Sequence, residues 1–370
     1  MLGEIAVRSC VRVSAQEYSV SPTGNQYEFY CFDDLLGWRN APGAHGIYTR
    51  NEFGYPISIN AFGMRQKEVN LKKKAGVFRI AFLGDSFVWG IGVLDEQRFT
   101  DIIGLTPNVE SLNFGVSGYG PIQYLILADK IASFNPDLVV VAFCLSNDFG
   151  DNVLYQRYGY CKPYGVVDDK GELKVKGYPI RNVRGFGRYG AQYYGILCKY
   201  SRLAELIVGM ASQKLASREN AGLLSFDDQL IYRFPNVSKE ELESVEQAVL
   251  INKRILEKIK GKLSAKRIPL VIVTVPTKDE YEKEHMGGAE LNTNAVDMLS
   301  RTARELDIDV IDAVPILTIQ DFFTKDAHWN SSGHQKMAIE IKKYLQRKGY
   351  IRFEAKSSPV GVRNSLHRAI

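Results

Sequence analysis

A carboxylate and an imidazole lie two residues apart near the end of the chain, as Asp326 and His328. A serine hydroxyl is a poor nucleophile at neutral pH until an imidazole accepts its proton, and the imidazole needs a carboxylate on its other nitrogen. Ser86 follows a short apolar run that closes with Gly84, where a strand is expected to turn into a loop. The three residue types predict nucleophilic catalysis by Ser86, with the alternative that Ser86 only caps the helix after it.

The other four histidines are less suited to serve as the base. Two lie in polar loops, one in an expected helix and one in the C-terminal tail, so we expect structural or solvated roles for them. They are, in that order, His45, His285, His334 and His367.

Apolar runs and amphipathic stretches alternate from residue 78 onward, and these are the elements that must position the side chains. We expect buried strands over residues 78–84, 111–114, 137–145, 269–275 and 307–311. We expect helices over residues 120–134, 238–263, 292–306 and 331–348. The alternation predicts right-handed βαβ crossovers and an α/β fold around a parallel sheet of about five strands.

The loops that follow these strands are the candidate site, because ligands of open parallel sheets bind outside the carboxyl ends of the strands. The loop after the second strand contains Gly118 among other glycines, which let the backbone approach a ligand and present an N–H to it. The loop after the third strand contains Asn147, whose amide either faces a ligand or else caps or braces the turn.

Three further regions flank or interrupt this core. Residues 1–75 mix aromatic residues, glycine and proline without sustained periodicity, and we expect an irregular N-terminal module packed on the core. The core domain is expected over residues 76–350, with an insertion at 150–236 that includes a helical stretch near residues 199–215. Insertions beside a catalytic face often supply a lid or a substrate wall. Residues 351–370 are expected to form a polar tail.

Composition and charge exclude several classes of protein. The 370 residues are 45% apolar and 24% charged, which is ordinary for a folded globular chain. The net charge of +5 is spread along the chain without an aromatic-interleaved basic stripe, so no nucleic-acid partner is expected. Five cysteines without C-x-x-C spacing predict neither a zinc site nor a disulfide framework, although one disulfide remains open. Cys144 is expected to be a buried small hydrophobe, and no metal or other cofactor is implied.

The opening of the chain bears on its location. No stretch reaches the roughly 18 apolar residues of a membrane span, and the first residues are too short and charged for a signal peptide. The expectation is therefore a cytoplasmic protein without stable membrane insertion. The alternative is a periplasmic or membrane-anchored protein whose apolar anchor precedes this opening.

Four blocks of the chain, taken in order, resemble those of the SGNH (GDSL-like) hydrolase superfamily. They are Gly84-Asp85-Ser86, Gly118 in its glycine-rich loop, Asn147 before Asp148, and Asp326-x-His328. The last block is similar to a bacterial subgroup that reads D-x-H-W-N-x-x-G-H, whereas many members of the superfamily place the aspartate three residues before the histidine. The resemblance implies a flavodoxin-like three-layer α/β/α sandwich, and the absence of a G-x-S-x-G elbow agrees with it.

The resemblance implies a role for each residue. Ser86 would be the nucleophile, His328 the general base and then acid, and Asp326 the carboxylate that orients the imidazole. The backbone N–H groups of Ser86 and Gly118 and the side chain of Asn147 would form the oxyanion hole. Negative charge develops there in a tetrahedral intermediate.

Two other stretches resemble the same subgroup. Residues 36–38 with 60–65 are similar to its N-terminal preamble, and residues 275–281 are similar to a segment of proteins that handle acylated polysaccharides. Three residues are therefore expected in a substrate pocket, with packing or surface roles as the alternative: Trp89, Lys278 and Tyr281.

Together the residues and the resemblance predict acyl or acetyl ester chemistry on a carbohydrate or a small lipid-like substrate. Hydrolysis and O-acetyl transfer to a polysaccharide use the same residues, so that choice stays open. A catalytically silent glycan-binding protein is one alternative. A nucleotide-binding flavodoxin-like protein is another, although the chain lacks the phosphate-binding patterns G-x-x-x-x-G-K-[ST] and G-x-G-x-x-G.

Overall fold

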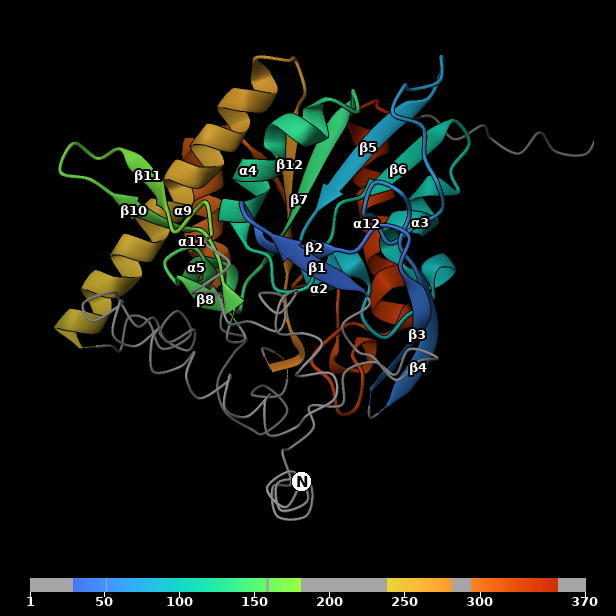
Figure 1. Cartoon of the computed structure of the whole chain (residues 1–370), viewed down its shortest axis with the longest axis horizontal. Helices are drawn as coiled ribbons and strands as arrows, with labels where there is room; N and C mark the ends of the chain where they lie inside the picture. The colour runs from blue at the N-terminus through green and yellow to red at the C-terminus, as the bar shows by residue number, and fades with distance from the viewer. Residues whose placement is uncertain are drawn as a thin grey trace, which may run out of the picture.

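A parallel sheet of five strands forms the centre of the molecule (Figure 1). The strands are β5 (Phe78–Leu83), β6 (Val109–Asn113), β7 (Leu138–Cys144), β12 (Leu270–Val275) and β13 (Asp309–Ile311). Their spatial order is β13-β12-β7-β5-β6, which is the doubly wound order of flavodoxin-like folds when read from the β6 edge. Every predicted strand is present, with ends that shift by at most two residues.

The computed structural model describes residues 29–50, 52–157, 160–180, 238–279, 281 and 294–351. The predicted helical stretch near residues 199–215 lies outside them, as do His285, His367 and the tail from residue 352 onward.

Helices cover both faces of the sheet, which makes the predicted three-layer sandwich. One face packs against α4 (Pro121–Ala132), α9 (Lys239–Ser264) and α11 (Asn294–Glu305). The other packs against α3 (Phe99–Gly104) and α12 (Ser331–Arg347). Because helices cover both faces, the central strand β7 is buried along its whole length, which explains its uninterrupted apolar sequence.

Two antiparallel hairpins precede the core. They pair β1 (Tyr30–Asp33) with β2 (Gly37–Asn40), and β3 (His45–Arg50) with β4 (Phe53–Ser58). The residues before the core are thus more regular than their sequence indicates, because strands of four to six residues are too short to show sustained periodicity. A separate apolar cluster joins this part to Trp89 of the core.

The described part of the insertion also consists of short antiparallel pairs. After α5 (Asp148–Asp151), β8 (Gln156–Arg157) pairs with β9 (Tyr160–Cys161), and β10 (Tyr164–Val167) pairs with β11 (Leu173–Lys176). These strands lie beside α9 and α5 (Figure 1), so the beginning of the insertion is packed against the core.

Among the described helices, none is both long and apolar enough to cross a membrane. Cys144 is buried, as expected, and no disulfide links Cys31, Cys144 or Cys161 to another described residue. Cys10 and Cys198 lie outside the described residues.

Candidate active site

Ser86 is the first residue of α2 (Ser86–Trp89), which begins directly after β5 and Gly84. Asp85 is the N-cap of this short helix, and its side chain accepts a hydrogen bond of 2.9 Å from the Phe87 backbone N–H. The capping role that Ser86 could have had is therefore filled by its neighbour. The Ser86 hydroxyl is left free to bond elsewhere.

The Ser86 hydroxyl contacts the imidazole of His328, which lies 242 positions further along the chain. Ser86 Oγ is 2.7 Å from His328 Nε2, and His328 Nδ1 is 2.5 Å from Asp326 Oδ1. The Asp326 carboxylate is almost fully buried, whereas the imidazole retains 16% of its exposure. A neutral imidazole protonated on Nδ1 donates to Asp326 and leaves Nε2 as the acceptor for the serine proton, as nucleophile activation requires.

The loop that carries His328 is held by short-range contacts. Asp326 Oδ1 also accepts a bond of 3.0 Å from the His328 backbone N–H, so one carboxylate orients both the backbone and the ring. The next residue, Trp329, is fully buried and donates through Nε1 to the Pro276 carbonyl at 3.0 Å. Asn330 then caps α12 through its side chain. The imidazole is thereby fixed between the end of β12 and the start of α12.

Gly118 lies in the loop after β6, at a backbone φ of +77° that favours glycine. Its neighbour Ser117 is anchored on both sides: the carbonyl accepts from Trp38 Nε1 at 2.9 Å, and the hydroxyl accepts from Tyr30 at 3.0 Å. The hairpin of β1 and β2 therefore helps to shape the loop that carries the second expected oxyanion donor.

Asn147 follows β7 and is the N-cap residue of α5, but its side chain makes no capping bond. Its Nδ2 instead donates to Asp151 Oδ2 at 2.9 Å, one helical turn further on. Asn147 Oδ1 is buried and has no hydrogen-bond partner among the described residues. Asn147 therefore does not cap α5, and its side chain instead braces the first turn of α5 through a bond to a buried carboxylate.

Three carboxyl groups close to Ser86 and Asn147 in the chain are buried, and sequence reasoning assigned no role to them. Burial raises the pKa of Asp85 and that of Asp151, and it raises the pKa of Asp148 well above the ordinary value. Arg157 opposes the rise in the pKa of Asp151, through an ion pair of 3.1 Å. Lys162 also donates to the Asp151 carbonyl.

The three expected pocket residues have different positions. Trp89 is fully buried, with Nε1 donating to Asn40 Oδ1 at 3.1 Å, and its ring packs near Tyr48. Tyr281 is 2% exposed, and its hydroxyl donates to the Val314 carbonyl at 2.8 Å. Both therefore have the packing role that was the alternative expectation. Lys278 is half-buried and donates through Nζ to the Thr324 carbonyl at 2.6 Å, near the His328 loop.

The described histidines other than His328 lie apart from the hydroxyl. His45 is exposed on β3, and His334 is 1% exposed inside α12. His334 Nδ1 is the acceptor for the Phe99 N–H at 3.4 Å, and burial lowers the pKa of His334 to about 3. Both positions agree with the structural or solvated roles expected for them.

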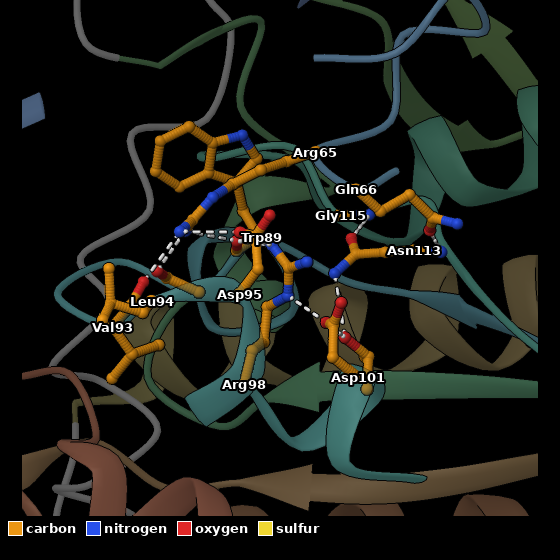
Figure 2. A network of polar contacts seen from close by, with 12 residues as sticks. Arg65, Gln66, Trp89, Val93, Leu94, Asp95, Arg98, Asp101, Asn113 and Gly115 are labelled. Carbon is orange, nitrogen blue, oxygen red and sulfur yellow. Dashed lines mark hydrogen bonds and ion pairs between the residues drawn. The ribbon is translucent and has the colours of Figure 1, made fainter. Parts of the chain in front are cut away.

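Two buried arginines fix the C-terminal end of α2, the helix that begins at Ser86 (Figure 2). Arg65 and Arg98 each donate to the Trp89 carbonyl at 3.0 Å. Arg65 also donates to the carbonyls of Gly90 and Val93, at 2.5 Å and 2.7 Å. Arg65 closes the stretch 60–65 that resembles the preamble of the bacterial subgroup, which is the one sequence signal that could have identified it.

Comparisons with known proteins give one match to a family model. Residues 234–360 match the model described as the SGNH hydrolase-like domain of the acetyltransferase AlgX. This match includes Asp326 and His328 and begins after the loops of Ser86, Gly118 and Asn147. A search of curated proteins finds no match.

Solved structures similar to the chain are distant. A lipolytic protein of the G-D-S-L family from Desulfitobacterium hafniense is 13% identical, covers 72% of this chain and 99% of its own, and has a TM-score of 0.37. A carbohydrate acetylesterase from Sinorhizobium meliloti is 11% identical, covers 73% of this chain and 99% of its own, and has a TM-score of 0.36. An acetyl-xylooligosaccharide esterase from Geobacillus is 11% identical, covers 77% of this chain and 100% of its own, and has a TM-score of 0.38.

The matched residues contain the last of the four blocks, and the structure brings its Asp326 and His328 into hydrogen-bonded contact with Ser86 of the first block. Over residues 234–360 the chain is similar to the SGNH hydrolase-like domain that the family model describes.

Proposed function

We propose that this protein is a serine-dependent acyl-ester enzyme that acts on an acyl or acetyl ester, with a carbohydrate as the favoured substrate class. Ser86 Oγ attacks the ester carbonyl while His328 Nε2 takes its proton, and Asp326 stabilises the imidazolium that forms. His328 then returns the proton to the leaving alcohol, which leaves an acyl-enzyme on Ser86. Water or an acceptor hydroxyl, deprotonated by the same imidazole, resolves that intermediate.

The oxyanion hole in this proposal consists of the backbone N–H groups of Ser86 and Gly118 and the side-chain N–H of Asn147. These donors come from the loops after β5, β6 and β7, which are neighbours in the sheet. Loss of one such donor costs about a hundredfold or more in rate.

The observation that carries the proposal is the continuous hydrogen-bonded row from Ser86 Oγ through His328 to Asp326, with distances of 2.7 Å and 2.5 Å. Its members come from opposite ends of the core. The row also weakens the alternative of a silent glycan-binding protein, because binding alone gives no reason for a buried carboxylate, an imidazole and a hydroxyl to be aligned.

Transfer to a polysaccharide hydroxyl is the second candidate. It is favoured by the family model matched over residues 234–360, which carries the description of an acetyltransferase. Hydrolysis and transfer differ only in the nucleophile that resolves the acyl-enzyme, so both start from Ser86.

One experiment tests both candidates. Purified protein is incubated with p-nitrophenyl acetate, with and without acetyl-free glycans, and the products are analysed by mass spectrometry. Acetylated glycan that forms with the wild type but not with Ser86→Ala supports transfer, and acetate release alone supports hydrolysis. Fluorophosphonate labelling with peptide mapping accompanies it: modification at a residue other than Ser86, or none, overturns the proposal.

A further inference from the structure

The Asn147 side chain can be useful in an oxyanion hole in only one of its two orientations. A carboxamide carries two N–H donors on one side and an oxygen acceptor on the other. If the amide turned by half a rotation, its oxygen would replace the nitrogen and would repel a developing oxyanion. Something must therefore determine which side of Asn147 faces the reaction.

Asp151 lies where it can determine the orientation of the Asn147 carboxamide. It lies one turn after Asn147 on α5, where side chains four residues apart are neighbours, and its Oδ2 accepts from Asn147 Nδ2 at 2.9 Å. An ionised carboxylate is an acceptor only, so it holds the amide nitrogen and rejects the amide oxygen. One N–H of Asn147 is bound in this way, and the second remains on the same nitrogen for another acceptor.

Arg157 opposes the effect of burial on Asp151 and so favours the ionised carboxylate that this choice requires. Asp151 is fully buried, and burial raises the pKa of its carboxyl group. Arg157 Nη1 lies 3.1 Å from Asp151 Oδ1, and the Lys162 ammonium donates to the Asp151 carbonyl. These two cations, together with the Asn147 N–H, favour the charged form. Both cations come from the insertion after α5, so the insertion contributes to the site.

We propose that Asp151, held by Arg157, is a positioning residue that orients the Asn147 carboxamide with its nitrogen toward the oxyanion of the reaction. The inference deepens the proposed function and rests on it. Asp151 does not touch the reacting atoms, and it acts only through Asn147.

A double-mutant cycle on the rate of Ser86 phosphonylation by a fluorophosphonate tests this dependence, because the phosphonyl oxygen occupies the oxyanion position and no natural substrate is needed. Asn147→Ala is expected to slow labelling about a hundredfold. Asp151→Asn, whose amide can both donate and accept, is expected to slow it about tenfold or more, since Asn147 can then turn. In the Asn147→Ala background, the same Asp151→Asn change is expected to alter the rate by less than about twofold.

Asp137→Asn is the matched control. Asp137 also has a cationic partner, Lys73 at 2.5 Å, and accepts from a backbone N–H, but it precedes β7 at the opposite end of the sheet. Its substitution is expected to leave the labelling rate unchanged. Thermal unfolding of every variant separates lost folding from lost rate.

The possible outcomes separate a failure of the Asp151 positioning role from a failure of the proposed function. Wild-type labelling of Asp151→Asn, or losses that multiply in the double mutant, overturns the positioning role. An unchanged labelling rate for Asn147→Ala would show that Asn147 does not contribute to the oxyanion hole. Absence of Ser86 labelling in the wild type would overturn the proposed function. If Asp151→Asn does not fold, Arg157→Lys, at a partly exposed position, replaces it in the same cycle, with a slowing of several-fold expected only while Asn147 is present.

Discussion

The contacts of Asp326 explain why an aspartate two residues before the histidine suffices here. A separation of two residues lets one carboxylate oxygen accept from both the His328 backbone N–H at 3.0 Å and the ring Nδ1 at 2.5 Å. The aspartate thus bonds to the local backbone and to the proposed base at the same time. Both hydrogen bonds require that Asp326 Oδ1 act only as an acceptor.

Asp326→Asn is expected to lower kcat for p-nitrophenyl acetate by about 10³ to 10⁴. The new amide can donate to His328 Nδ1, which places the ring proton on Nε2 and removes the acceptor for the Ser86 hydroxyl. Stopped-flow or steady-state hydrolysis at neutral pH measures the effect, with thermal unfolding as the check on folding. Asp279→Asn, an exposed aspartate, is the control. A kcat within about tenfold of wild type would contradict the assignment of Asp326.

His334 gives a prediction about stability and pH. Its pKa is lowered by burial from 6.5 to about 3, and its ring stacks on Phe99. Between these values the unfolded chain binds the proton and the folded chain does not, so stability present above pH 6.5 is lost as the pH falls toward 3. The slope from this one group reaches at most about 1.4 kcal/mol per pH unit.

His334→Asn retains an acceptor near the Phe99 N–H but does not titrate. We expect its free energy of unfolding, from urea titrations between about pH 7 and pH 4, to fall less steeply than that of wild type. Carboxylates contribute equally to both proteins and cancel in the difference. Parallel curves for the two proteins would show that His334 is not the group responsible.

At the scale of elements, α2 is pressed against the loop after β6. A Cβ built on Gly115 would lie 2.3 Å from the Trp89 backbone nitrogen and 2.6 Å from the Val88 carbonyl carbon. Asn113 bridges the same two elements, since its Nδ2 donates to the Val88 carbonyl at 2.6 Å and its Oδ1 accepts from the Gly115 N–H at 2.9 Å. The place of the Ser86 helix therefore depends on a backbone contact that only glycine allows.

Gly115→Ala is expected to displace α2 and to slow Ser86 labelling by about tenfold to a hundredfold, because misplacement of a reacting group by about 1 Å has that cost. The free energy of unfolding is expected to fall by about 1 to 3 kcal/mol. Gly261→Ala is the matched control: this glycine is inside α9 with nothing within 4 Å of the added Cβ. It is expected to leave labelling unchanged and to stabilise the protein by about 0.5 to 1 kcal/mol. A fully active Gly115→Ala protein would refute the argument.

At the scale of the whole molecule, the hairpin of β3 and β4 connects the two distant halves of the site. Glu52 accepts from the backbone N–H groups of Thr324 and Lys325, each at 2.7 Å, directly before Asp326. Tyr55 of the same hairpin accepts through its hydroxyl from the Gly92 N–H at 2.9 Å, just after α2, the helix that begins at Ser86. The hairpin therefore braces the serine segment and the histidine segment against each other.

Glu52→Gln is expected to slow Ser86 labelling by about threefold to tenfold, because an amide can replace only one of the two accepted bonds and the histidine loop becomes less well positioned. Thermal unfolding is expected to change little, since these bonds are exposed to solvent. Glu68→Gln is the control: it also accepts from a backbone N–H, that of Ala61 at 2.9 Å, but it contacts neither segment. Equal labelling rates for the two variants would show that the brace has no effect on the site.

Much of the core and the identity of the candidate triad could be predicted from the amino-acid sequence. Strands buried on both faces require uninterrupted apolar runs, as in β7, and the order of the runs along the chain determines that their carboxyl ends meet at one edge. Ser86, Asp326 and His328 were identifiable because nucleophilic catalysis requires those residue types at such edges. Local chemistry and periodicity are sufficient for conclusions of this kind.

Only the tertiary structure decided which of these residues touch. The 2.7 Å contact between Ser86 and His328 spans 242 positions, and no local pattern encodes such a distance. The burial of Trp89, the bond from Asn147 to Asp151 and the ion pair that Arg157 adds from the insertion depend on how separate elements pack. Side-chain packing is a property of the assembled core, because the neighbours of a residue are set by the fold and not by its position in the chain.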